Sequence, residues 1–345
     1  MERWADSRAA SLTGRAGGPA LQAPDEIVER MHALGEPLGV DVLPLLAWRA
    51  DALRLERQGA VSAGGAARLL ATADGWVCVN LPREDDVASI PAWLEAGEPG
   101  DNHWAFVRDV VATFTTVHVV ERAVLLGLPV AAVGEVATQP FTAVHARGGH
   151  VPVSTGAPLV VDLSSLWAGP LCARLLADRG ARVVKVESPE RPDGARLGPK
   201  AFWDRLHHDT EQVVLPLDSS ELRRLLDEAD VVIEASRPRA LGQHRLGPDS
   251  CRAKVWVSIT GHGRGSDRVA FGDDAAAAGG LVAWPDDEIG GPCFVADAVA
   301  DPLTGVAAAT AATQALEAEG TWLVDVPMAG VAAWVAGGAT PRWAR

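Results

Sequence analysis

The fold is decided by residues 158–187, which read PLVVDLSSLWAGPLCARLLADRGARVVKVE. The valine-rich runs near its two ends, VVDL and ARVVKVE, are typical of buried strands. The segment between them, AGPLCARLLADRG, has Pro170 near its first turn and Gly180 after its end, a pattern that predicts a helix. Two strands joined by one helix in so short a stretch predict a right-handed parallel β-α-β unit.

The residues that follow continue this alternation of strands and helices. Apolar strands are expected at 229–236 (ADVVIEAS) and 254–263 (KVWVSITGHG). A small-residue helix at 301–318, a strand at 320–328 and a last helix at 329–338 complete the series. Such alternation predicts the α/β class with an open, mostly parallel sheet.

The first part of the chain has a different character. Residues 25–58 show helical patterns, and RLLATADGWVCVNL (68–81) predicts a hairpin that turns at Ala73-Asp74-Gly75. GLPVAAVGEV (127–136) is expected as a short strand. The predicted organisation is an N-terminal segment (1–24), a small α+β domain with a helical lead-in (25–135), a linker (136–157) and an α/β domain (158–345).

Composition excludes several classes of protein. The formal net charge of the 345 residues is −14, and without a basic run the chain is a poor partner for nucleic acid. No apolar run reaches the ~18 residues that a membrane span needs, and MERWADSRAAS does not resemble a signal peptide, so we expect a cytoplasmic protein that does not enter a membrane. The four cysteines are far apart in sequence, and we expect no metal site.

The common catalytic and nucleotide motifs are also missing. The turn after the first strand of the β-α-β unit contains only Gly169, so GxGxxG is absent and NAD binding is a weak interpretation. Walker A, GxSxG and HExxH patterns do not occur either.

Seven segments of the chain carry a stronger signal. They are VVDLSSLWAGP (160–170), LLADRGARVVKVESPERPDGAR (175–196), ADVVIEASRPRAL (229–241), VSITGHGRGSDR (257–268), FGDDAAAAGGL (271–281), VADPLTGVAAA (299–309) and VDVPMAGVAAW (324–334). In order and spacing they resemble segments of the class III CoA-transferases. This family, the carnitine dehydratase and bile-acid-inducible protein F group, includes formyl-CoA transferase, carnitine CoA-transferase and α-methylacyl-CoA racemase. Each segment alone is weakly specific, but seven in order are a strong signal.

The resemblance implies a Rossmann-like domain that binds CoA as a substrate and not as a permanent cofactor. It implies a CoA-transferase acting between an acyl-CoA and a carboxylic acid, and a homodimer. The catalytic carboxylate of the family corresponds to Asp301 in VADPLTG. In the transferases this carboxylate attacks the thioester to form a mixed anhydride, the thiolate returns to give an aspartyl-CoA thioester, and the acceptor then takes the CoA.

The residues around Asp301 also allow a purely structural role. Asp301 precedes Pro302 at the expected start of a helix, so spacing alone favours a helix N-cap. The two roles are compatible, because we expect a carboxylate at a helix N-terminus to stay ionised and nucleophilic.

Other residues are assigned to CoA binding by the resemblance alone. Leu166, Trp167 and Ala168 correspond to the loop that contacts the pantetheine arm. Arg245 corresponds to a basic residue that can meet the CoA phosphates, although a solvated arginine at a helix end is an equally good interpretation. His262 replaces an aromatic residue common in the family, and a partly buried loop histidine is the favoured interpretation.

Two departures from the family pattern affect the predicted function. The racemases carry a histidine where this chain has Asp273, before Asp274, so racemisation is disfavoured; the pair could simply be a solvated turn or a helix cap. Residues 203–212 lack the basic residues of the family, which puts CoA affinity in question. The alternatives are therefore a racemase, isomerase or dehydratase of the same fold, or a degenerate non-catalytic subunit.

The order of the segments is unusual as well. Residues 11–21, 59–81 and 118–136 resemble parts of the family that usually follow the β-α-β segment, which suggests a circularly permuted or partly duplicated chain. Gly64 and Gly65 then correspond to a glycine loop that closes over the active site and excludes water. An ordinary flexible loop is an equally good interpretation.

Overall fold

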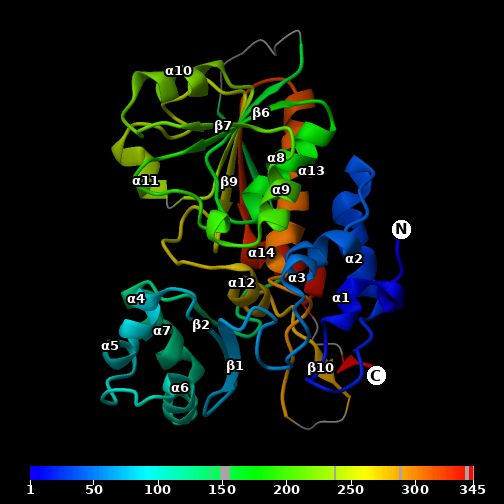
Figure 1. Ribbon diagram of the computed structural model, residues 1–345, viewed down its shortest axis with the longest axis vertical. Coiled ribbons are helices and arrows are strands. Elements are labelled where there is room, and N and C mark those ends of the chain that lie inside the picture. The colour runs from blue at the N-terminus through cyan, green and yellow to red at the C-terminus, as the bar shows by residue number, and fades with distance from the viewer. Residues whose placement is uncertain (141, 148–155, 237, 287–289, 339–341, 345) are drawn as a thin grey trace.

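A seven-stranded sheet forms the centre of the upper part of the molecule (Figure 1). The computed structural model describes residues 1–140, 142–147, 156–236, 238–286, 290–338 and 342–344. The strands, in spatial order, are β4 (Ala143–Ala146), β11 (Trp322–Pro327), β9 (Val255–Thr260), β8 (Val231–Glu234), β5 (Leu159–Asp162), β6 (Arg182–Glu187) and β7 (Glu211–Val214).

Six of these strands are parallel, which confirms the predicted α/β class. β5 and β6 pair in parallel with Val161 opposite Val184, and α8 (Ala168–Asp178) connects them as predicted. β4 alone runs antiparallel, at the edge beside β11. It lies within the stretch 136–157, so that stretch is more than a linker. Its four residues, AVHA, are too short to show an alternating pattern, and pairing with β11 makes them a strand.

Helices cover both faces of the large sheet. Val160, Ile233 and Val257 face α8 and α13 (Ala300–Glu317) in one buried cluster. Val161 and Trp256 belong to a cluster on the other face, together with residues of α10 (Ser220–Glu228) and α11 (Pro238–Gln243). This arrangement explains why the strand sequences are continuously apolar.

The helix α13 is rich in alanine and buried on nearly all sides. Its small residues allow α8 to approach closely: a Cβ added at Gly305 would lie 2.7 Å from the backbone oxygen of Ala168. The start of α8 and the first turns of α13 are therefore held next to each other.

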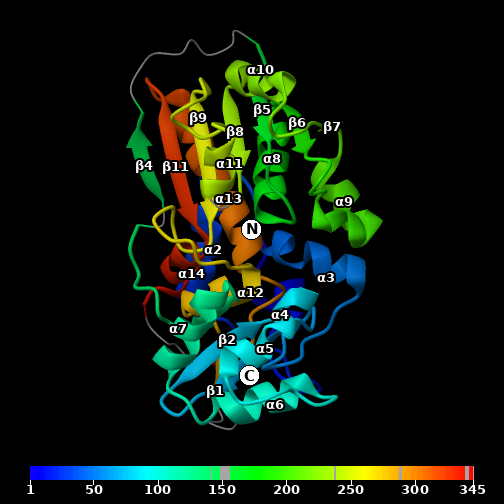
Figure 2. The same ribbon diagram turned by 90° about the vertical axis from the view of Figure 1, so that its left-hand side faces the viewer.

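A three-stranded antiparallel sheet lies in the lower part of the molecule (Figure 2). It consists of β1 (Ala67–Ala71), β2 (Trp76–Asn80) and β3 (Val130–Ala132). The predicted hairpin is confirmed, and the Asp74 carboxylate of its turn accepts the Thr116 N–H at 2.7 Å. The surrounding helices are α4 (Glu84–Ala88), α5 (Ile90–Leu94), α6 (His103–Val111) and α7 (Thr116–Leu126).

The first 60 residues pack beside α13 and against the end of the chain. Trp4 meets Trp343 edge to face with 5.5 Å between ring centroids, and Gln22 bridges to Ala344. The helical elements here are η1 (Trp4–Asp6), α1 (Arg8–Ser11), α2 (Asp25–Gly35), η2 (Glu36–Leu38), η3 (Leu43–Ala47) and α3 (Trp48–Leu53). The remaining elements are η4 (Gly194–Leu197), α9 (Lys200–His207), α12 (Gly272–Ala278), α14 (Met328–Ala336), β10 (Trp284–Pro285) and β12 (Arg342–Trp343).

The short helix α12 connects the two sheets. Leu69 and Cys78 of the small sheet pack with Ala277 of α12, and Phe294 joins the same cluster. The small sheet is thus fixed to the region where α12 and α13 begin. Within the described ranges, no helix combines the length and apolarity required to cross a bilayer.

Candidate active site

Asp301 is the second residue of α13 and lies beside the first residue of α12. The Gly272 N–H donates a hydrogen bond to its carboxylate, and a Cβ at Gly272 would overlap Asp301 Oδ2. The helix begins at Ala300, after Val299, without a side-chain cap. The expectation of an N-cap is therefore wrong, because the carboxylate turns toward α12 and not toward the amides of its own helix.

The environment of Asp301 opposes its negative charge. Burial, with contributions from Asp273 and Asp297, raises the pKa of Asp301 from 3.8 to about 7, although Arg49 and the Gly272 N–H act in the opposite direction. The expectation that Asp301 stays fully ionised is thus wrong near neutral pH. The helix N-terminus does not replace the hydration that the carboxylate loses.

Two more carboxylates lie on α12, and neither belongs to a solvated turn. Asp273 is 7% exposed and accepts the Ala298 N–H at 3.1 Å, while Asp274 is 1% exposed. Asp274 accepts the Phe271 N–H at 3.0 Å, so the expected capping role is confirmed for it. Burial raises the pKa of Asp273 to about 6 and that of Asp274 to about 7. Both are acids poised near neutrality.

A fourth carboxylate, Asp297, is paired with an arginine from the first part of the chain. Arg49 on α3 donates to it through Nε at 2.9 Å and Nη2 at 2.5 Å, and Asp297 is fully buried. Burial disfavours the guanidinium charge, but Asp297, then Asp273 and Asp301, outweigh burial and raise the pKa of Arg49. One cation therefore faces three carboxylates.

The backbone around Asp297 is strained. Ala296 and Ala298 have φ values of 50° and 45°, a left-handed conformation that alanine rarely adopts. The Ala296 N–H donates to Thr13 Oγ1 at 3.0 Å, and the Ala298 N–H is held by Asp273. These contacts hold the backbone on both sides of Asp297 in this conformation.

The predicted glycine loop lies over Arg49. Gly64 is exposed, and a Cβ added to it would lie 3.1 Å from Arg49 Nη2. Gly65 has a φ of 84°, which favours glycine at this turn. Two neighbours of this loop reach α12: Ser62 donates to Asp273, and Asn80 Nδ2 donates to Asp274 Oδ1 at 2.8 Å. The small sheet and its loop thus adjoin the acidic cluster.

The predicted pantetheine loop also comes close to this cluster. Leu166 is 40% exposed and has a φ of 72°, and its N–H is held by Asp193 Oδ1 at 3.0 Å. Trp167 is buried, and its ring lies 5.8 Å from Arg49 Cζ. Ala168 begins α8, next to Gly305 of α13. The loop is therefore one helical turn from Asp301.

Arg245 and His262 are placed differently. Arg245 is exposed beyond the end of α11, and its backbone oxygen accepts a hydrogen bond from Arg223. His262 is half-buried in the loop after β9, where burial and then Arg268 lower its pKa to about 4. This environment matches the interpretation of a partly buried, neutral loop histidine. No contact among the described residues joins either side chain to Asp301.

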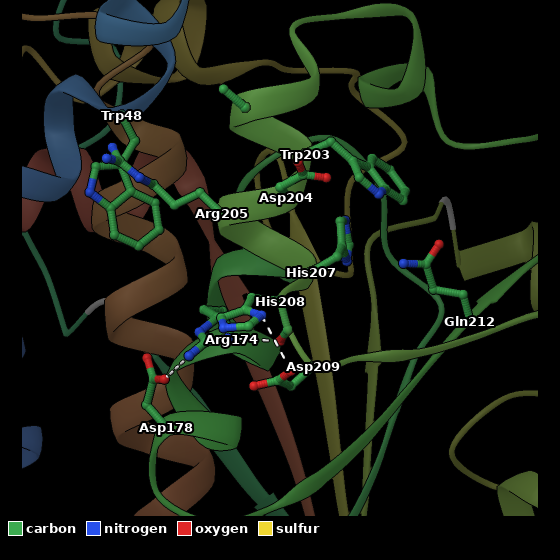
Figure 3. Close-up of a pocket in the computed structure, with 11 residues that line it drawn as sticks. Trp48, Arg174, Asp178, Trp203, Asp204, Arg205, His207, His208, Asp209 and Gln212 are labelled. Atoms are coloured by element: carbon green, nitrogen blue, oxygen red, sulfur yellow. Dashed lines mark hydrogen bonds and ion pairs between the residues drawn. The ribbon is translucent and has the colours of Figure 1, made fainter.

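A cavity of about 820 Å³ surrounds the end of α9 (Figure 3). Trp48 and Arg205 lie on one side of the helix, with Arg205 Cζ 5.1 Å from the Trp48 ring. Trp203 and His207 lie on the other side, and their ring centroids are 4.0 Å apart with the planes tilted by 35°. The stretch 203–212, in which the family's basic residues are missing, thus lines an open cavity.

Sequence reasoning missed Arg49 and Asp297. Arg49 lies in LLAWRADAL, where an arginine reads as a solvated residue of a surface helix. Asp297 carries one signal: the repeat VADAVAD places it four residues before Asp301. Among the described residues, no group of three or more His, Cys, Asp or Glu side chains has the geometry to hold a metal ion. In the part of the chain that the structure describes, the positive charge next to the carboxylates of the site is that of Arg49.

Comparison with known proteins gives a family match. A family model described as CoA-transferase family III matches residues 157–343. A succinyl-CoA–D-citramalate CoA-transferase of Chloroflexus aurantiacus is 30% identical over 178 residues, covering 46% of this chain and 44% of the relative. The human α-methylacyl-CoA racemase is 37% identical over 110 residues, covering 30% of this chain and 28% of the racemase.

A solved structure gives a further comparison. The crystal structure of a CAIB/BAIF family protein from Brucella suis matches with a TM-score of 0.49 and 25% identity, over 56% of this chain and 60% of that one. The chain spans about half of the length of the curated relatives that it matches, or less. Arg49, Gly64 and Asn80 all lie before the first residue that the family model matches.

Proposed function

The chain belongs to CoA-transferase family III, and from this premise we propose that it transfers CoA from an acyl-CoA to a carboxylic acid through a covalent intermediate on Asp301. One observation carries the proposal. Among the four clustered carboxylates, Asp301 keeps part of its surface accessible, whereas Asp273, Asp274 and Asp297 are buried. Asp301 is therefore the least buried of the four residues and the best candidate for contact with a substrate.

The proposed reaction neither consumes nor releases a proton. The ionised Asp301 carboxylate attacks the thioester carbon, forming a mixed anhydride and releasing CoA thiolate. The thiolate attacks the aspartyl carbon of the anhydride and releases the donor acid as a carboxylate, which leaves an aspartyl-CoA thioester. The acceptor carboxylate then repeats the two steps in reverse order, and Asp301 is restored. The Gly272 N–H, which already donates to Asp301, orients the attacking oxygen.

The loop Leu166–Trp167–Ala168 is the proposed site of the pantetheine arm. Its exposed Leu166 is anchored by Asp193, and Ala168 borders the turn of α13 that follows Asp301. We propose the cavity around α9 for the nucleotide end of CoA. The Trp203 ring already has two partners, since Arg196 Cζ lies 4.1 Å from it and the centroid of the tilted His207 ring lies 4.0 Å away. We therefore expect contacts to ring edges and amides there, and no stacking.

The segment order remains a proposal, in which the small domain precedes the catalytic one and its glycine loop closes over Asp301. The contacts of Ser62 with Asp273 and of Asn80 with Asp274 support this arrangement. A small sheet packed away from α12 would have argued against it. We also propose a homodimer, as the family resemblance implies.

A second candidate function is proton transfer at the α-carbon of an acyl-CoA. Asp273 and Asp301 have pKa values raised to about 6 and 7, which suits a general acid and base near neutral pH. Deuterium incorporation at the α-carbon from D2O would identify this reaction, whereas CoA transfer leaves the α-carbon unlabelled.

The first experiment is intact-mass analysis after incubation with acetyl-, propionyl- or succinyl-CoA and hydroxylamine. An activated aspartyl group should be converted to a hydroxamate that maps to Asp301 and is lost in Asp301→Ala. Asp109→Ala, which changes an exposed carboxylate on α6, is the matched control and should keep the modification. CoA binding without a modification would favour proton transfer, and absence of both would favour a non-catalytic subunit.

A further inference from the structure

We propose that Arg49 is a positioning residue: held by Asp297, its guanidinium favours the negative charge of Asp301. This inference rests on the proposed role of Asp301 as the nucleophile. Arg49 belongs to α3, outside the residues that the family model matches, so the matched half of the chain does not contain this part of the site.

The geometry gives Arg49 one defined orientation. Its two hydrogen bonds to Asp297 form a planar, bidentate pair, which a lysine cannot reproduce. Trp167 lies on one side of the guanidinium, and Gly64 lies so close that an added Cβ would be 3.1 Å from Arg49 Nη2, which would require the guanidinium to shift slightly. Asp297, fully buried between two strained alanines, therefore holds the guanidinium beside Asp301.

Three charged groups of the described chain surround the Asp301 carboxylate. The charged groups that face Asp301 are Asp273 on α12, Asp297 in the preceding loop and Arg49 on α3. The two other carboxylates disfavour a negative charge on Asp301, and Arg49 is the cation that favours it. Without Arg49, a larger fraction of Asp301 should be protonated at neutral pH, and less of it could attack a thioester.

Removing either member of the ion pair should move the pH dependence in opposite directions. Arg49→Gln deletes the cation, so the ascending limb of the rate of adduct formation from succinyl-CoA should move to higher pH by one unit or more. That shift means a loss of about tenfold at pH 6.5, recovered at high pH. Asp297→Asn deletes an anion and leaves Arg49 unneutralised, so the limb should move to lower pH. General damage to the site would lower the rate in both variants at every pH.

Graded variants test the geometry separately from the charge. Arg49→Lys keeps the charge but loses the planar pairing, and it should lower the rate with a smaller pH shift than Arg49→Gln. Gly64→Ala displaces the guanidinium without removing it and should act in the direction of Arg49→Gln. Arg108→Gln on α6, where Arg108 pairs with Asp109 at the surface, is the matched control and should leave the profile unchanged.

A measurement without substrate keeps this inference separate from the proposed function. The free energy of unfolding of Asp301→Asn, relative to that of the parent protein, should grow with pH. The difference should level off near pH 7, where Asp301 of the parent becomes ionised in the folded state. In the Arg49→Gln background it should level off at a higher pH. If the parent protein forms no adduct, the proposed function fails while this titration still tests Arg49. The inference would be overturned if the pH–rate profile and the pH at which the stability gain levels off stay unchanged in the variants. It would also be overturned if they move in the same direction in Arg49→Gln and Asp297→Asn.

Discussion

Asp301 illustrates how a carboxylate that we propose as the nucleophile can lower the stability of its own fold. Its pKa in the folded protein, about 7, lies above its ordinary value of 3.8. The folded state therefore keeps a proton that the unfolded state releases, and the free energy of unfolding falls as pH rises from about 4 to about 7. Above pH 7 the full cost of the buried charge is present.

Asp301→Asn should therefore raise the thermal midpoint at pH 8 and change it little at pH 4. The amide keeps the shape of the carboxylate and removes the charge, so we expect the free energy of unfolding at pH 8 to rise by on the order of 1 to 3 kcal/mol. This is less than the full pKa shift would give, because Asp301 is partly exposed. Calorimetry at the two pH values measures it. Asp109→Asn, at an exposed site, should show no such difference. Equal midpoints for the parent and Asp301→Asn at pH 8 would contradict the explanation.

The junction between α12 and α13 depends on the absence of one side chain. At Gly272 a Cβ would overlap both Asp301 Oδ2 and the Ala298 backbone oxygen. Gly272→Ala should therefore separate the two helix starts, with a loss on the order of 1 to 3 kcal/mol and a lower rate of adduct formation. Urea unfolding and intact-mass kinetics measure the two effects. Gly247→Ala, where an added Cβ meets no atom within 4 Å, is the control; equal effects at the two glycines would refute the argument.

The sequence predicted the elements better than it predicted the site. The periodicities of residues 158–187 and 68–81 depend on local pattern, and both units formed as expected. β4 was missed because four residues carry no pattern and its pairing partner, β11, is distant in sequence. The burial of Asp273 was missed for the same reason: the neighbours that remove its water come from three distant segments.

For Asp301, the sequence predicted the position and the candidate role but not the protonation state. Its place at a helix start was readable from Asp-Pro, and its candidate role from seven ordered segments. Its protonation was not readable, because that depends first on its burial in the folded protein and then on Arg49, which is far away in sequence. Spacing describes the residues along one element, whereas the charge of a group depends on all elements that surround it.

At the scale of the whole molecule, the charges around the proposed nucleotide site predict how salt would affect CoA binding. The cavity around α9 contains two arginines and three aspartates, and Arg174 is already paired with Asp178. Burial lowers the pKa of His207 to about 4, so it adds no positive charge at neutral pH. The phosphates of CoA would therefore meet little net positive potential.

We accordingly expect CoA to raise the thermal midpoint by nearly the same amount in 50 mM and 300 mM NaCl, because screening has few attractive charges to act on. Thermal shift titrations at the two salt concentrations test this. Asp204→Asn and Asp209→Asn together should strengthen binding at low salt. A steep loss of binding on adding salt to the parent protein would show that cations outside this cavity hold the phosphates.

The contact between Trp4 and Trp343 has a consequence for biosynthesis. Trp343 is made 339 residues after Trp4, the indole that it covers. At roughly 5 to 20 residues per second, the early segment waits for tens of seconds with its apolar face uncovered. The two indoles can therefore pair only after residue 343 has been made, and the coupling between their chromophores in circular dichroism would report when this contact forms.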